Sequence, residues 1–253
     1  MSFCSSMTRL RDIVLATVFP FACRVCDRLV TRFDNGIGCD GCWAELEVKQ
    51  RTVKRACSRC GVTLPGVMDN RNEGRECHRC SRLSIVAARS IGPHLGVLRE
   101  SVLWLKSHPQ ICNRLQRLIE VAWLELPEPW DFDAIVPVPL HPRREAGRSF
   151  NQAFLIGEVV SRASGCRLET AVLIRVRDTE RHRLGMGDEE RARSLRGAFA
   201  ATAPRLIRGR RLLLVDDVLT TGSTADEASR TLLAAGAREV ALLTISRAER
   251  FSQ

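Results

Sequence analysis

Four Cys-x-x-Cys pairs constrain this chain more than any other feature of its sequence. They account for eight of the eleven cysteines. Two residues between the cysteines of a pair allow both sulfurs to reach one tetrahedral ion at about 2.3 Å. Four such pairs in series predict two structural zinc ions. The predicted ligands are Cys23, Cys26, Cys39, Cys42, Cys57, Cys60, Cys77 and Cys80. A disulfide framework in a secreted protein is the alternative, but scattered further cysteines and a large second domain argue against it.

The spacing of the pairs leaves their pairing open. Consecutive pairs can share one ion, and so can alternating pairs in a cross-braced arrangement. Gly61 directly follows one pair, where the turn of a zinc knuckle often needs a positive φ. Residues 1–83 contain too few apolar side chains for a large core, so metal is expected to hold them folded. We therefore expect a double zinc-ribbon-like module over 1–83 and a second domain over 84–253.

The N-terminus contains a short apolar stretch over residues 13–22, interrupted by Pro20. It is too short for a membrane span and lacks the cleavage site of a signal peptide. A short amphipathic helix that ends at Pro20 is expected instead. The chain is accordingly expected to have no membrane span and to lie in a reducing cytoplasm.

The remainder of the chain alternates between strand and helix patterns, which is typical of a mostly parallel sheet with helices on both faces. Residues 175–196 form a long polar and charged segment between two of the strands. The apolar spacing predicts helices over 95–105, 115–123, 150–164 and 223–235, and strands over 84–91, 134–139, 172–174, 197–201, 211–215 and 239–245.

The formal net charge of +10 indicates an anionic ligand or partner. Only three of the 39 basic residues are lysines, and arginine forms bidentate contacts with phosphate. Four thiolates around each of two zinc ions would lower the surplus to about +6. The basic signal is therefore modest.

The most informative segment covers residues 212–224. A buried apolar strand is followed by Asp216 and Asp217, and then by a turn of small hydroxyl residues that enters a helix. Free N–H groups at a helix N-terminus and nearby hydroxyls favour a phosphate, whereas ionised carboxylates accept hydrogen bonds from a sugar diol. A phosphate beside a diol indicates a ribose 5-phosphate. The candidate binding residues are Asp216, Asp217, Thr220, Thr221, Gly222, Ser223 and Thr224.

This segment resembles the signature of type I phosphoribosyltransferases, which bind phosphoribosyl pyrophosphate. A second segment, residues 136–152, is similar to the pyrophosphate loop of the competence-associated ComF family, in which a cysteine-rich zinc module precedes such a domain. The resemblance covers about residues 19–247. It implies a type I phosphoribosyltransferase-like α/β fold, phosphoribosyl pyrophosphate bound with Mg²⁺, and pyrophosphate contacts from Arg143 and Arg148.

The resemblance also directs attention to two further features. Ser149 stands where the family usually has a glycine, so a changed backbone turn is expected there. The segment 175–196 corresponds to a mobile lid over the ligand, and Lys106 is a candidate to reach the phosphates from a helix end. No catalytic residue is assigned.

Two functions of different classes remain open. The resemblance implies a binding protein for phosphoribosyl pyrophosphate that acts in natural competence, contacts incoming single-stranded DNA and has a helicase or another DNA-processing protein as its partner. The alternative is an active phosphoribosyltransferase of nucleobase or nucleotide metabolism with an unidentified acceptor.

We predict that the purified protein carries two zinc ions that hold residues 20–83 folded. Thiolate ligation contributes on the order of 10 kcal/mol per site. Elemental analysis is expected to give two zinc ions per chain. Fewer than one zinc per chain, together with disulfides among the eight paired cysteines, would contradict the prediction.

Overall fold

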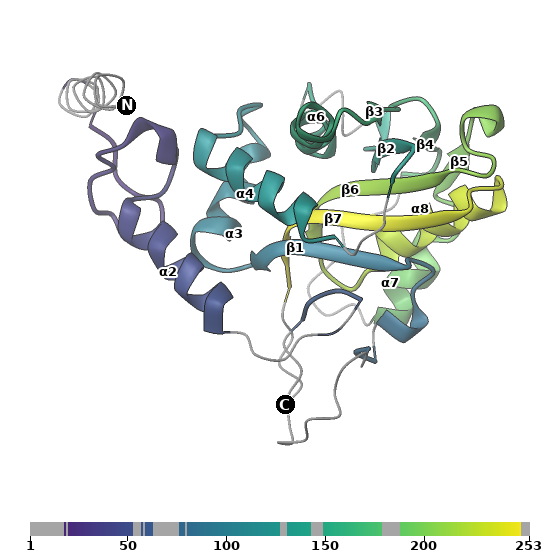
Figure 1. The fold of residues 1–253 in the computed structure, drawn as a ribbon, viewed down its shortest axis with the longest axis horizontal. Helices are drawn as coiled ribbons and strands as arrows, with labels where there is room; N and C mark the ends of the chain where they lie inside the picture. The colour runs from purple at the N-terminus through teal and green to yellow at the C-terminus, as the bar shows by residue number, and fades with distance from the viewer. Residues whose placement is uncertain are drawn as a thin grey trace.

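A five-stranded, wholly parallel sheet forms the centre of the molecule (Figure 1). The computed structural model describes residues 18, 20–52, 57, 59–62, 76–78, 80–126, 131–142, 149–178 and 188–248. The strand order is β1-β7-β6-β2-β3. The strands are β1 (Ala87–Pro93), β2 (Ala134–Pro137), β3 (Arg167–Leu168), β6 (Arg211–Leu219) and β7 (Glu239–Arg247).

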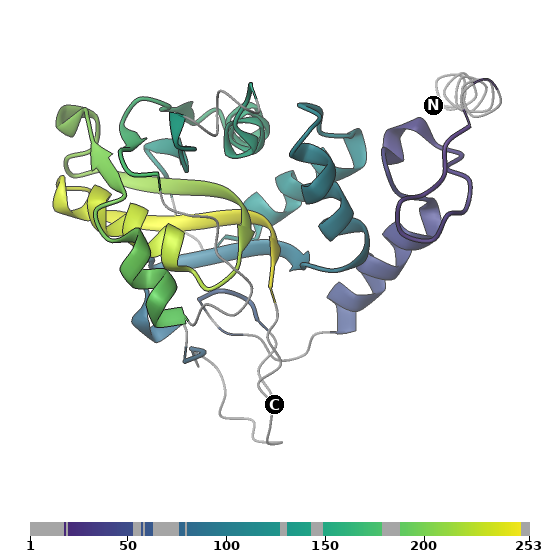
Figure 2. The ribbon, with the colours of Figure 1, turned by 180° about the vertical axis from the view of Figure 1, so that it is seen from behind.

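Helices cover both faces of this sheet, as the alternating pattern predicts (Figures 1 and 2). Neighbouring residues of β6 point to opposite sides, so Leu213 packs on one face and Leu214 on the other, and both are fully buried. One face carries α3 (Gly96–Leu105), α4 (Asn113–Leu124) and α6 (Gln152–Ser164), and the other carries α7 (Asp188–Leu195) and α8 (Ser223–Ala234).

The helix ends follow local sequence rules. Asn151 caps α6, because its Oδ1 accepts a hydrogen bond from the backbone N–H of Ala153 at 3.0 Å. Gly165 ends the same helix in a left-handed conformation. The apolar spacing thus predicts these helices to within a few residues.

The charged segment 175–196, expected to form a lid, contains a helix in its last part. Its last part forms α7, whose Leu195 is fully buried beside α8. Before it, β4 (Leu173–Arg175) pairs antiparallel with β5 (Phe199–Ala201) in a small separate sheet. The segment that forms α7 has two apolar residues among many charged ones, so its apolar periodicity is too weak to predict the helix. Residues 179–187 lie outside the described part of the chain.

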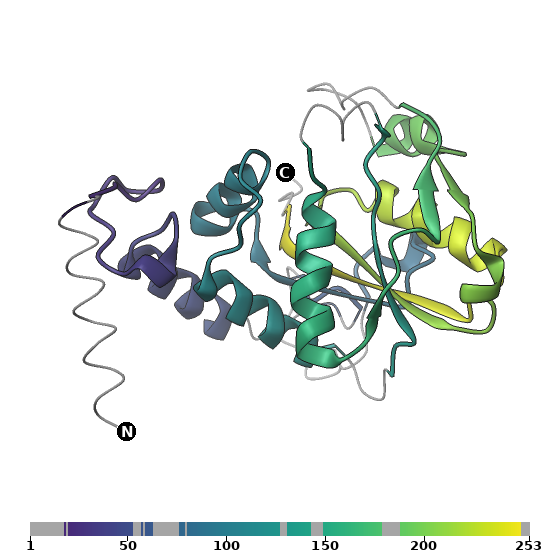
Figure 3. The same ribbon diagram turned by 90° about the horizontal axis from the view of Figure 1, so that it is seen from above.

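Residues 20–52, drawn in purple, lie at one end of the molecule and contact the sheet through α3 and α4 (Figure 3). They contain a short 3-10 turn, η1 (Phe33–Asn35), and an unexpected helix, α2 (Asp40–Thr52). Trp43 and Leu46, one turn apart, are buried side chains that attach α2 to the core, next to the buried Cys42. The helix expected before Pro20 lies almost entirely outside the described residues. Within the described ranges, no helix is both long and apolar enough to cross a membrane.

Candidate functional site and metal centres

The first metal candidate is the tetrad Cys23, Cys26, Cys39 and Cys42, whose four sulfurs lie within 4.8 Å of one another. Three Sγ–Sγ separations between neighbouring thiols of this tetrad are 3.5–3.8 Å. Four sulfurs placed tetrahedrally about 2.3 Å from zinc are about 3.8 Å apart. Arg28 Nε donates to Cys26 Sγ at 3.4 Å, and this bond lowers the thiol pKa to about 6. The tetrad therefore fits a zinc ion.

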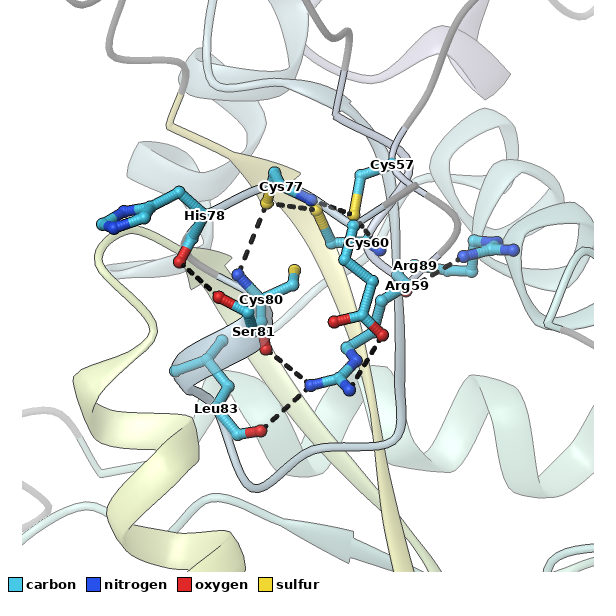
Figure 4. A network of polar contacts seen from close by, with 10 residues as sticks. Cys57, Arg59, Cys60, Cys77, His78, Cys80, Ser81, Leu83 and Arg89 are labelled. Carbon is cyan, nitrogen blue, oxygen red and sulfur yellow. Dashed lines mark hydrogen bonds and ion pairs between the residues drawn. The ribbon is translucent and has the colours of Figure 1, made fainter. Parts of the chain in front are cut away.

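The second metal candidate is the tetrad Cys57, Cys60, Cys77 and Cys80. Backbone N–H groups of Cys60 and Cys77 donate to Cys57 Sγ at 3.5 and 3.2 Å. A hydrogen bond from the Cys80 thiol is the main reason that the pKa of Cys60 falls to about 5. Figure 4 shows the four cysteines gathered around one point. Thiolates supported by N–H donors suit a structural zinc site.

These two tetrads settle the pairing that the spacing left open. Consecutive pairs share one site, and the cross-braced arrangement does not occur. The same turn follows the first pair of each tetrad, with φ values of 58° at Asp27 and 69° at Gly61. The two tetrads are not packed together, because the first belongs to the core on the α3 and α4 face and the second to the core on the α8 face.

The candidate ligand site lies where β6 ends. β6 continues beyond the predicted boundary at residue 215, so Asp216 and Asp217 belong to the strand itself. Asp216 pairs in register with Thr244 of the neighbouring β7. Burial, and then the charge of Asp217, raise the pKa of Asp216 well above its ordinary value, and Arg175 opposes the shift only in part. The carboxyl pair therefore contains a group that holds its proton more strongly than a free aspartic acid.

Residues 219–223, from the last residue of β6 to the start of α8, form the phosphate-loop candidate. Gly222 has a φ of 85° and is the N-cap of α8. Thr221 Oγ1 lies 2.8 Å from Ser223 Oγ and accepts from the Ser223 N–H at 3.3 Å. Thr221 is only 9% exposed, so this bonding fixes the loop internally. The structure thus brings Asp216, Asp217 and the loop to the carboxyl edge of the sheet, where open α/β sheets bind ligands.

A row of polar side chains on β1 and β7 extends the same edge, and the sequence reasoning missed it. His94 Nδ1 lies 2.8 Å from Ser246 Oγ, and Ser90 Oγ lies 2.6 Å from Thr244 Oγ1. Burial lowers the pKa of His94, the nearby charge of Lys106 lowers it further, and Asp217 acts in the opposite direction. Thr244 and Ser246 interrupt an otherwise apolar buried strand, and this interruption is the signal that could have revealed them.

The structure describes residues 149–152, which follow the expected pyrophosphate loop, but not the two arginines of that loop. Arg143 and Arg148 lie outside the described residues, as do residues 179–187 of the expected lid. Ser149 adopts a φ of 63°, in the left-handed region that favours glycine, although it replaces the glycine of the family pattern.

Among residues 149–152, Gln152 is buried at the start of α6, and its Nε2 has no hydrogen-bond partner among the described residues.

Comparisons with known proteins agree with this architecture. Residues 152–250 match the family model described as "Phosphoribosyl transferase domain". This match and the parallel sheet confirm the expected class, a phosphoribosyltransferase-like fold behind a cysteine-rich module.

Three curated relatives identify the family. The chain is 31% identical to the DNA utilization protein YhgH of Escherichia coli strain K12, over 78% of this chain and 86% of that protein. It is 30% identical to competence protein F of Haemophilus influenzae, over 91% and 98%. Competence protein ComFC of Bacillus subtilis matches at 33% over 45% of this chain and 44% of its own length. The chain belongs to the ComF family.

Replacing Asp216 by asparagine is expected to stabilise the ligand-free protein. The pKa of Asp216 is higher in the folded protein than in the unfolded chain. The free energy of unfolding therefore falls as the pH rises from the unfolded-state pKa toward the folded-state pKa. The melting temperature of Asp216→Asn should therefore exceed that of the parent by an amount that grows as the pH rises above the unfolded-state pKa of Asp216. Asp131→Asn, at an exposed position, is the control. Equal pH dependence in the parent and Asp216→Asn would contradict the assignment.

Proposed function

We propose that this chain binds phosphoribosyl pyrophosphate with Mg²⁺ at the carboxyl edge of its sheet and acts in natural competence, in the handling of incoming single-stranded DNA. The observation that carries the proposal is the sequence of strand β6, its two acids, the hydroxyl loop and the N-terminus of α8. The names of the relatives, which refer to competence and to DNA utilization, support the cellular role.

The chemistry of the edge supports a ribose 5-phosphate in particular. The loop around Gly222 offers backbone N–H groups and hydroxyls to a phosphate at a helix N-terminus. Asp217 is available to accept hydrogen bonds from the ribose hydroxyls, and a protonated Asp216 could donate one. Arg143 and Arg148 would hold the pyrophosphate, and Mg²⁺ would supply further positive charge there.

An active transferase is the second candidate function, and the perturbed carboxyl pair favours it. Strongly shifted pKa values gather at reacting centres, and the pKa of Asp216 is raised beside Asp217. In such a transfer the bond from ribose C1 to pyrophosphate breaks and a bond from C1 to an acceptor nitrogen forms. Pyrophosphate leaves with the bonding electrons, and the proton of the acceptor nitrogen passes to a base or to water. A screen for pyrophosphate release across nucleobases and DNA tests this candidate.

Asp217→Ala and Thr221→Ala are each expected to lose phosphoribosyl pyrophosphate binding without unfolding the domain. Loss of a charge-assisted contact costs roughly 1.5–3 kcal/mol, which corresponds to a drop in affinity of at least about tenfold. Calorimetry with the ligand and Mg²⁺ measures it. Thr221→Ser, which keeps the hydroxyl that bonds Ser223, should retain binding. Unchanged affinity in both alanine variants would remove this edge as the binding site.

Single-stranded DNA is expected to bind weakly and without sequence preference through basic residues between the two tetrads. Arg51, Lys54 and Arg55 form this cluster, and their side chains lie outside the described part. Arg59, the fourth basic residue of the cluster in the sequence, already bonds the carbonyls of Cys80 and Leu83. Three phosphate contacts predict a slope of log affinity against log salt of roughly −2.

Reversal of Arg51, Lys54 and Arg55 to glutamate should abolish DNA binding and leave phosphoribosyl pyrophosphate binding intact. Titration of labelled single strands at several salt concentrations checks both the slope and the variant. A salt-independent affinity, or a triple variant that binds DNA like the parent, would favour a protein partner for this surface.

A further inference from the structure

The chain between the second tetrad and β1 packs directly against the phosphate-loop candidate. This bridging segment, residues 80–84, begins with the short turn η2 (Cys80–Arg82). A Cβ placed on Gly222 would lie 3.0 Å from Leu83 Cδ1 and 3.1 Å from its Cδ2. The Leu83 side chain therefore rests on the loop at the position where its backbone is left-handed.

A hydrogen bond fixes the same segment to the first turn of α8. The backbone N–H of Ser84 donates to Asp226 Oδ1 at 2.7 Å. Asp226 in turn donates its own N–H to the carbonyl of Gly222 at 2.8 Å. Arg230 Nε holds the second carboxylate oxygen of Asp226 at 2.9 Å. The loop, the helix start and the bridging segment thus form one connected unit.

The second tetrad holds this segment through Arg59, which lies between two of its cysteines. Arg59 Nη1 donates to the carbonyls of Cys80 and Leu83, and its Nη2 pairs with Glu76 at 2.9 Å. Figure 4 shows the Arg59 guanidinium inserted between the cysteines and the backbone of Leu83. The position of Leu83 therefore depends on the geometry that the tetrad imposes.

The other side of the loop is tied to the same tetrad. Arg247, at the end of β7, donates from Nη1 to the carbonyl of Cys60 at 2.9 Å, and this contact is buried. Arg247 pairs in register with Leu219, and the N–H of Ala248 donates to the Leu219 carbonyl at 2.9 Å. The second tetrad is thus linked to the phosphate-loop candidate at two points, through Arg247 at Leu219 and through Leu83 at Gly222.

We propose that metal occupancy of the second tetrad sets the conformation of residues 219–226, with Leu83 and Asp226 as positioning residues for the phosphate. Binding of metal at Cys57, Cys60, Cys77 and Cys80 and binding of phosphoribosyl pyrophosphate at the loop then stabilise each other, because coupling between two sites is reciprocal. The first tetrad, which packs with α3 and α4 on the other face, does not share this coupling. The ligand part of the inference rests on the proposed function.

Hydrogen exchange of the ligand-free, zinc-loaded chain tests the positioning without any ligand. Leu83→Ala should raise the exchange rate of residues 219–226 about tenfold through easier local opening, and Leu83→Met should restore protection. Leu118→Ala is the matched control, since Leu118 is also a partly buried leucine but packs on the other face of the sheet. Unchanged exchange in Leu83→Ala would overturn the proposal.

Cysteine alkylation in the presence of a zinc chelator, followed by mass spectrometry, tests the coupling. Saturating phosphoribosyl pyrophosphate with Mg²⁺ should slow alkylation of the second tetrad by about 5- to 150-fold, the usual range for coupled sites, and leave the first tetrad unchanged. In Leu83→Ala, ligand at concentrations that saturate the variant should slow alkylation of the second tetrad by a smaller factor than in the parent. Equal protection of both tetrads, or of neither although the ligand binds, would overturn the coupling. Failure of the ligand to bind would overturn the proposed function alone, and the exchange measurement then decides the positioning role.

Discussion

The parallel pairing of β6 with β7 is the interaction on which the candidate site depends. Its register places Asp216 beside Thr244 and Leu219 beside Arg247, so the acids, the polar row and the loop all meet at one edge. The apolar halves of both strands are fully buried, and successive side chains enter the cores on the two faces of the sheet. A shift of one residue would reverse every one of these side chains, so burial fixes the register and with it the site.

Much of this fold could be predicted from the sequence, because the buried strands and amphipathic helices have clear apolar patterns. The exceptions have physical reasons. α2 buries only a narrow stripe around Trp43 and Leu46, and two cysteines of the first tetrad lie at its start, so its pattern is obscured. β6 was predicted too short because paired acids rarely lie inside a strand. Here Thr244 of β7 continues the ladder beside Asp216, so strand pairing outweighs the local preference.

Some residues of the candidate site could likewise be predicted from the sequence, whereas others could not. The loop and its acids are contiguous in the chain, so a motif could reveal them and also suggest their chemistry. The contacts of His94 with Ser246 and of Leu83 with Gly222 join residues far apart in sequence, and only the folded chain brings them together. The cysteine spacing predicted two metal sites, but the choice of consecutive pairs needed the geometry. Local patterns therefore identify ligands, whereas the supporting contacts come from tertiary structure.

The carboxyl edge of the sheet, which holds these groups, contains features that reduce the stability of the folded state. Ser149 takes a left-handed backbone conformation, and Asp216 lies beside a second acid with its pKa raised well above the ordinary value. A left-handed backbone at a residue other than glycine lowers the stability of the folded state by roughly 1–3 kcal/mol and persists only where the surroundings determine it strongly. A zinc ion in the second tetrad would contribute on the order of 10 kcal/mol. The second tetrad is linked to the loop through Leu83 and Arg247, so its stabilisation would act close to the binding edge as well as on the fold.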